Sequence, residues 1–125
     1  MAPRRQKKPE EILSEQVINA LRQRHVYFFH PANEGRRTWY EAKTFHVNGG
    51  LAGVADLVLL LPGGRCVFVE LKAGRNKQEK SQIAFEAEVT ARGFEYYIWR
   101  SADEAVAFCN KLTREGAHAK AAGIL

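Results

Sequence analysis

Three charged residues lie at the ends of two strongly apolar stretches of this chain. Asp56 comes directly before the apolar run 57–61, and Glu70 and Lys72 end the run that begins at residue 65. Charged groups in such surroundings are costly unless they are paired or hold a cation. Two carboxylates that bind a metal ion, beside a lysine that stabilises phosphate charge, are the groups of a metal-dependent phosphodiesterase. The three residues predict a site of this kind.

The loop Pro62–Gly64 between the two runs decides whether the carboxylates meet. A three-residue hairpin loop is expected as a type I turn, favoured by the proline, followed by a left-handed residue, favoured by the last glycine. Leu61 then faces Arg65, and counting back along both strands places Asp56 opposite Glu70. Directly opposed residues share a face of the sheet, with Cβ atoms about 5 Å apart.

A second register is also compatible with this sequence. A two-residue loop made of Gly63 and Gly64 would pair Asp56 with Leu71, on the face opposite to Glu70. We favour the three-residue loop because it leaves no carboxylate isolated and keeps Lys72 on the same face by the two-residue period of a strand. A structural ion pair at a strand end is the alternative interpretation of the three charged residues.

The elements that would position these residues follow from periodicity and turn signals. The pattern predicts an α/β fold with a restriction-endonuclease-like core, in which a mixed central sheet is flanked by helices in the order α-β-β-β-α-β-α. Both hairpin strands are apolar on both faces, as expected for central, covered strands. The expected elements are a helix from residue 9 or 10 to about 24, a strand at 26–30, a ragged strand or irregular loop at 38–47, hairpin strands at 57–61 and 65–72, a helix from about 81 to 92, a strand at 94–100, and a helix capped by Ser101 and Glu104 that ends near 113.

Composition limits the protein to one modest domain, expected at residues 10–113, between a basic arm at 1–9 and a weakly specified tail at 114–125. The arm holds four basic residues and no acid, so residues 9–125 carry 15 basic and 14 acidic side chains and are nearly neutral. Such an arm suits contact with a phosphate backbone. No export signal and no membrane-spanning run is visible, so we expect a cytoplasmic protein without membrane contact. Cys66 and Cys109 are expected in the core.

A longer string of residues resembles a known nuclease superfamily. Asp56, thirteen intervening residues and then Glu70-x-Lys72 resemble the PD-(D/E)XK pattern. Gly53 before the aspartate, Gln82 in the following helix and Trp99-Arg100-Ser101 narrow the resemblance to the VRR-NUC branch, over about residues 10–110. The branch includes small stand-alone phage and bacterial nucleases. The resemblance implies a homodimer that cleaves Holliday junctions or other branched DNA.

Roles for further residues come from the chemistry and from this resemblance. Asp56 and Glu70 offer hard oxygen ligands, which suit Mg²⁺ or Mn²⁺, and Lys72 is expected to orient water or stabilise phosphate charge. By resemblance, the backbone carbonyl of Leu71 is a further metal ligand, and Gln82 lines the catalytic site. The family carries an acid in the first helix, and Glu15 is the expected residue, either catalytic or metal-binding. A solvated surface glutamate is its alternative reading.

The expected function is divalent-metal-dependent DNA endonuclease activity on structured or branched DNA, above all Holliday-junction resolution. Arg75, Lys77 and Lys80 follow the Glu-x-Lys strand and are expected to contact DNA phosphates. A non-cleaving DNA-binding module of the same fold and a flap or restriction-type nuclease are the alternatives. A one-metal histidine nuclease built on His30 and His46 lacks the required spacing. The segment 31–50 is the expected dimer interface, because its aromatic residues fit no core stripe.

Overall fold

The computed structural model describes residues 5–31 and 38–121, with side chains described as far as Gly116. The chain groups into two compact units. The first holds residues up to Tyr27, Leu71–Asn76, and Ile98 onward, and the second holds Phe28–Glu70 and Lys77–Tyr97. In the part of the chain that the structure describes, no helix is long and apolar enough to cross a membrane. The division into an arm at 1–9, a domain at 10–113 and a tail at 114–125 stays a prediction.

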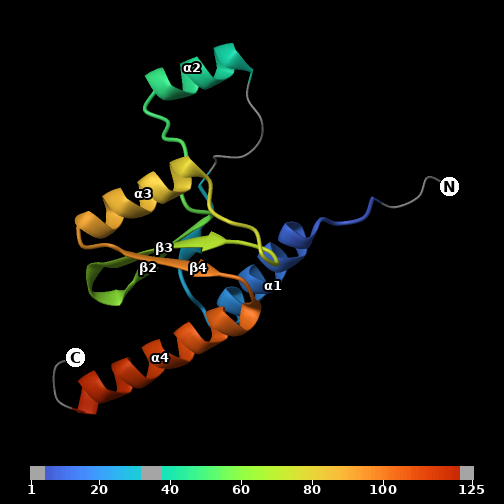
Figure 1. Ribbon diagram of the computed structural model, residues 1–125. Helices are drawn as coiled ribbons and strands as arrows, with labels where there is room; N and C mark the ends of the chain where they lie inside the picture. The colour runs from blue at the N-terminus through green and yellow to red at the C-terminus, as the bar shows by residue number, and fades with distance from the viewer. Residues whose placement is uncertain (1–4, 32–37, 122–125) are drawn as a thin grey trace. The chain divides into compact units, whose positions relative to one another are not determined.

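The first unit is built on two helices, α1 (Pro9–Gln23) and α4 (Ala102–Ala121), which contact each other (Figure 1). The apolar stripe of α1 is buried at Leu13, Val17 and Leu21, and the buried Ala105 and Cys109 belong to α4. Proline at the first helical position and acids in the first turn explain why α1 begins at Pro9. The predicted bounds of this helix are confirmed.

Helix α4 is longer than expected. It begins after Ser101 as predicted, but it continues to Ala121 instead of ending near residue 113. The sequence beyond residue 113 contains several alanines, which are strong helix formers, and their propensity supports the longer helix. The predicted capping bond also differs, because the Glu104 carboxylate accepts from the Arg100 N–H at 2.6 Å.

The second unit carries most of a mixed four-stranded sheet in the order β1-β2-β3-β4, made of β1 (Phe28–Phe29), β2 (Leu57–Leu61), β3 (Arg65–Leu71) and β4 (Glu95–Trp99). Helix α3 (Lys80–Ala91) lies beside this sheet (Figure 1). Its Phe85 is buried against the sheet. The Phe85 ring lies edge-on to Phe68 of β3 at 5.2 Å between centroids, and 6.2 Å from the ring of Tyr96 of β4. The predicted fold class is confirmed.

The hairpin has the predicted three-residue loop. Leu61 pairs with Arg65 and Leu57 with Val69, which excludes the two-residue alternative. The predicted turn type is wrong, because Gly63 has φ +81° and ψ 16°, the values of a type II turn. Glycine adopts this geometry without steric cost, and a second glycine follows it with φ +75°.

The predicted strand or loop at 38–47 is wrong, because Trp39–Val47 form a helix, α2. Its start is explained by a capping box. The Thr38 hydroxyl accepts from the Glu41 N–H at 3.1 Å, and the Glu41 carboxylate accepts from the Thr38 N–H at 3.2 Å. None of its residues is buried, so the helix lacks the apolar stripe by which helices are recognised. The preceding residues 32–37 lie outside the described part of the chain.

Candidate active site

The two carboxylates predicted to meet lie at the same end of the β2–β3 hairpin, where the register of the two strands relates them. Asp56 is one step beyond the register pair of Leu57 with Val69, and it therefore stands opposite Glu70. Glu70 is only 2% exposed, whereas Asp56 is partly exposed. A carboxylate as deeply buried as Glu70 requires polar or cationic partners. At this end of the hairpin, one acid is therefore buried and the other is partly exposed to solvent.

Gln82 at the start of α3 is oriented towards Glu70. Its side-chain oxygen accepts from the Glu79 N–H at 2.7 Å, which is one half of the capping box of α3. Its side-chain nitrogen donates to Glu70 Oε1 at 3.2 Å. If the Gln82 amide were flipped, its NH₂ group would face the Glu79 N–H, which is also a donor. Its oxygen would then face the Glu70 carboxylate, which is also an acceptor. The cap of α3 therefore fixes the donor that Glu70 receives.

Gly53 brings the chain before Asp56 against the same turn of α3. Its φ is +81°, and a Cβ placed on it would collide with the Ser81 carbonyl and lie 2.8 Å from the Gln82 nitrogen. Only glycine suits both this conformation and this approach. The close packing holds the segment that leads to Asp56 beside the segment that carries Gln82.

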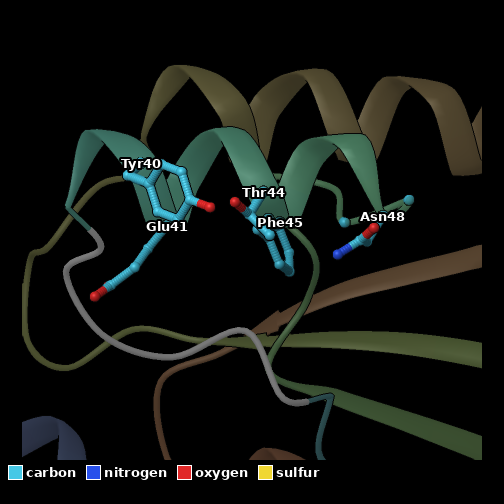
Figure 2. Close-up of a pocket in the computed structure, with 7 residues that line it drawn as sticks. Tyr40, Glu41, Thr44, Phe45 and Asn48 are labelled. Atoms are coloured by element: carbon cyan, nitrogen blue, oxygen red, sulfur yellow. The ribbon is translucent and has the colours of Figure 1, made fainter.

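A cleft of about 440 Å³ opens beside these residues. Asp56 and Gln82 line it, together with Phe45 and His46 of α2. A second pocket, of about 510 Å³, lies along α2 itself and is lined by Tyr40, Thr44 and Phe45 among others (Figure 2). The helix that the sequence did not predict therefore forms one wall of the cleft that Asp56 enters.

Tyr96 lies close enough to both acids to respond to their charge. Burial, with smaller contributions from the charges of Glu70, Glu86 and Asp56, raises the pKa of Tyr96 to about 12, against the lowering effect of a hydrogen bond from Gln78. Gln78 donates both to the Tyr96 hydroxyl at 3.1 Å and to the Glu86 carboxylate at 3.0 Å. Tyr96 thus remains a neutral phenol at ordinary pH.

Lys72 and the residues next to it belong to the first unit. Lys72 directly follows β3, is 7% exposed, and donates its backbone N–H to the Trp99 carbonyl at 3.1 Å. Leu71, whose carbonyl is an expected metal ligand, is also buried. Arg100 donates to the carbonyls of Gly74 and Asn76, each at 2.9 Å. Residues 99 and 100 therefore anchor the chain from Lys72 onward.

The remaining predicted site residues are exposed. Glu15 lies on α1 in the first unit, where its carboxylate accepts from Lys7 Nζ at 2.8 Å. Arg75 precedes α3, as does Lys77, and Lys80 is its first residue; all three side chains face solvent. The assignment of Glu15 to the site and of the three basic residues to DNA contact stays a prediction.

One contact near the site was not predicted from the sequence. His30 Nδ1 lies 2.6 Å from the backbone carbonyl oxygen of Asp56. The sequence pattern predicted His30 at the end of a strand, and it indicated no contact with Asp56. The local signal for this contact was a histidine directly before a proline, at the end of the strand that pairs with β2.

The acids present fit a hard divalent cation through their chemistry. Asp56 and Glu70 supply carboxylate oxygens, which Mg²⁺ and Mn²⁺ prefer. Among the residues with described placement, no group of three or more His, Cys, Asp or Glu side chains gathers around one point. Mg²⁺ typically keeps several water ligands and uses one or two carboxylates, so a two-carboxylate site suits it.

Two solved structures that are similar to this architecture are described as VRR_NUC proteins. A solved structure described as a VRR_NUC domain is 19% identical, covers 86% of this chain and 97% of its own length, and has a TM-score of 0.57. A second, described as a VRR_NUC domain protein, is 17% identical, covers 86% and 89% respectively, and has a TM-score of 0.64. No protein-family model and no curated protein matches the sequence. The chain has the fold of these VRR_NUC structures, which confirms the expected resemblance at the level of the fold.

Proposed function

We propose that this protein is a divalent-metal-dependent DNA endonuclease of the VRR-NUC type that hydrolyses phosphodiester bonds in branched or structured DNA. Holliday-junction resolution is the proposed activity. One observation carries the proposal: the hairpin register, continued one step beyond Leu57 and Val69, brings Asp56 opposite the buried Glu70 in a fold shared with VRR_NUC structures. Folds of this type usually use divalent metals.

Asp56 and Glu70 are the proposed metal ligands, with the Leu71 carbonyl and Glu15 as further candidates. A bound Mg²⁺ or Mn²⁺ would polarise the phosphoryl group and lower the pKa of a water molecule. Gln82 supports this role by holding Glu70 in one orientation, because its amide is fixed at both ends.

Lys72 is the proposed catalytic cation. Its two-residue spacing from Glu70 along the chain supports this assignment. An ammonium has three donors and no acceptor, so it is suited to stabilise charge on phosphoryl oxygens or to orient a water molecule. Arg75, Lys77 and Lys80 would then contact the DNA backbone, which needs exposed cations and no base-specific geometry.

Cleavage assays with matched variants test this proposal. Four-way junction, flap, duplex and single-stranded DNA are incubated with the protein in Mg²⁺, Mn²⁺ or EDTA. We expect metal-dependent cleavage of the junction, which Asp56→Asn and Glu70→Gln should lower by about 10²-fold or more while junction binding persists. Asp103→Asn, an exposed change of the same chemistry on α4, should cleave like the wild type.

Two results would contradict the proposal in different ways. Full Mg²⁺-dependent cleavage by Asp56→Asn would show that the site is wrongly assigned. Junction binding by the wild type without cleavage in any metal would instead indicate a non-cleaving DNA-binding module.

A further inference from the structure

A side chain from the end of β1 contacts the backbone of Asp56. His30 Nδ1 and the Asp56 carbonyl oxygen are 2.6 Å apart, a short hydrogen-bond distance for a nitrogen donor. A carbonyl oxygen only accepts, so the proton must be on Nδ1, and the imidazole is the donor. The contact therefore defines which ring nitrogen of His30 carries a proton.

The strand register explains why a side chain supplies this donor. β1 pairs antiparallel with β2, with Phe28 opposite Leu59 and Phe29 opposite Val58. Two steps further, the same register places Pro31 opposite Asp56. Proline has no backbone N–H, so the residue facing Asp56 cannot donate to its carbonyl. The imidazole of the preceding residue provides a donor at this position.

Asp56 is thus held from the strands on both sides of β2. Its neighbour Leu57 is paired with Val69 of β3, and its own carbonyl accepts from His30 at the end of β1. Asp56 lies one residue outside β2, where the direction of its side chain depends on the local backbone. A bond to this carbonyl therefore restricts where the Asp56 carboxylate points.

We propose that His30 is a positioning residue, which orients the Asp56 carboxylate for metal binding through its hydrogen bond to the Asp56 backbone. This inference rests on the proposed function, since it assumes that Asp56 is a metal ligand. The bond is exposed to water, which competes for both groups, so its removal should affect folding stability little. Groups that orient metal ligands nevertheless change metal affinity by about 10- to 100-fold.

Three substitutions of His30 test whether its effect depends on an N–H donor at the position of Nδ1. His30→Ala removes the donor. His30→Asn keeps an N–H group at the position of Nδ1, and His30→Gln moves it one bond further, to the position of Nε2. We expect Mn²⁺ binding, measured by calorimetry without DNA, to weaken about tenfold or more in His30→Ala. His30→Asn should restore most of the affinity and His30→Gln little of it.

Further measurements complete the test. Amide hydrogen exchange at Leu57 should accelerate in His30→Ala and recover in His30→Asn, while the thermal unfolding midpoints stay close to that of the wild type. Tyr27→Ala, which removes a 75% exposed ring shortly before β1, should change neither Mn²⁺ affinity nor exchange at Leu57. If His30→Ala does not fold, the Asn and Gln variants still provide the decisive comparison.

Each outcome supports or overturns the inference. Equal Mn²⁺ affinity in the wild type and His30→Ala, or an equal loss in the Asn and Gln variants, would overturn a role through the Asp56 carbonyl. A wild type that shows the His30-dependent Mn²⁺ affinity but cleaves no DNA would contradict the proposed function and leave the positioning role supported. A wild type that binds no Mn²⁺ would overturn both.

Discussion

At the scale of single residues, the buried Glu70 depends on a neighbour whose own orientation is fixed by a helix cap. The side-chain oxygen of Gln82 is used by the Glu79 N–H, so only its nitrogen can face Glu70. A capping box ordinarily stabilises a helix start. Here it also fixes the direction of a donor beside a buried carboxylate, and a single glutamine performs both roles.

Substitution of Gly53 tests the close packing of the chain before Asp56 against the start of α3. Gly53→Ala should destabilise the protein and lower Mn²⁺ affinity, because the new Cβ collides with the Ser81 carbonyl and displaces the chain before Asp56. Gly63→Ala is the matched control, since Gly63 has the same φ of +81° but open space around it. A left-handed conformation alone costs alanine about 1–2 kcal/mol.

Chemical denaturation of both glycine variants separates the cost of the left-handed conformation from the cost of the collision with the Ser81 carbonyl. We expect the free energy of unfolding to fall in both, but clearly more in Gly53→Ala, and the Mn²⁺ affinity to fall only in Gly53→Ala. Equal losses of stability and unchanged Mn²⁺ affinity in both variants would show that the close approach to α3 is unimportant.

At the scale of elements, the loop after Lys72 is tied down by a residue from the end of β4. Arg100 donates to the carbonyls of Gly74 and Asn76, and the Asn76 side chain donates to Glu10 of α1 at 3.2 Å. This loop holds Arg75, a proposed phosphate contact. These bonds hold the backbone and the Asn76 side chain of the loop, while the Arg75 side chain is exposed to solvent.

Arg100→Ala should therefore loosen the loop and weaken DNA binding. We expect amide exchange at residues 74–77 to accelerate several-fold and junction affinity to fall. Arg92→Ala is the control for lost charge, because Arg92 is an exposed arginine that pairs with Glu88 at the end of α3. If both variants lose the same junction affinity and amide exchange at 74–77 is unchanged, Arg100 contributes through its positive charge and does not hold the loop in place.

The hairpin and the helices α1 and α3 were predicted from strong sequence signals, whereas helix α2 and the contact of His30 with Asp56 were not predicted. The register of Asp56 and Glu70 followed from a three-residue loop and from the cost of isolating a carboxylate. Helix α2 was missed because it has no buried stripe, although the Thr38 and Glu41 capping box was visible. The contact of His30 with Asp56 depends on the β1–β2 register, which no short turn specifies.

At the scale of the whole molecule, the exposed apolar side chains of α2 need an explanation. Trp39 is 78% exposed, and Tyr40 and Val47 are each 72% exposed, on a helix of nine residues without a buried one. Exposed apolar groups that cluster in this way mark interaction surfaces more often than isolated ones do. The predicted dimer interface at 31–50 includes this helix.

Symmetric cleavage of a four-way junction supplies the reason to expect a second copy. In the proposed cleavage of a four-way junction, the two strands to be cut are related by a two-fold axis, and one chain would supply one proposed set of Asp56, Glu70 and Lys72. A C₂ dimer is the commonest way to gain the second set. We therefore expect a homodimer at micromolar concentration that makes paired nicks in a cruciform plasmid, measured by light scattering and by the ratio of linear to nicked product.

The α2 surface can be tested within the same experiment. Trp39→Glu should shift the protein to a monomer and convert paired nicks into single ones, because a charge cannot be buried at an apolar interface without a partner. Tyr27→Glu, at an equally exposed aromatic residue outside α2, should remain dimeric. A dimer that survives Trp39→Glu would place the interface on another surface. A wild-type monomer with uncoupled nicks would mean that each chain cleaves alone, since a single catalytic set cuts one strand at a time.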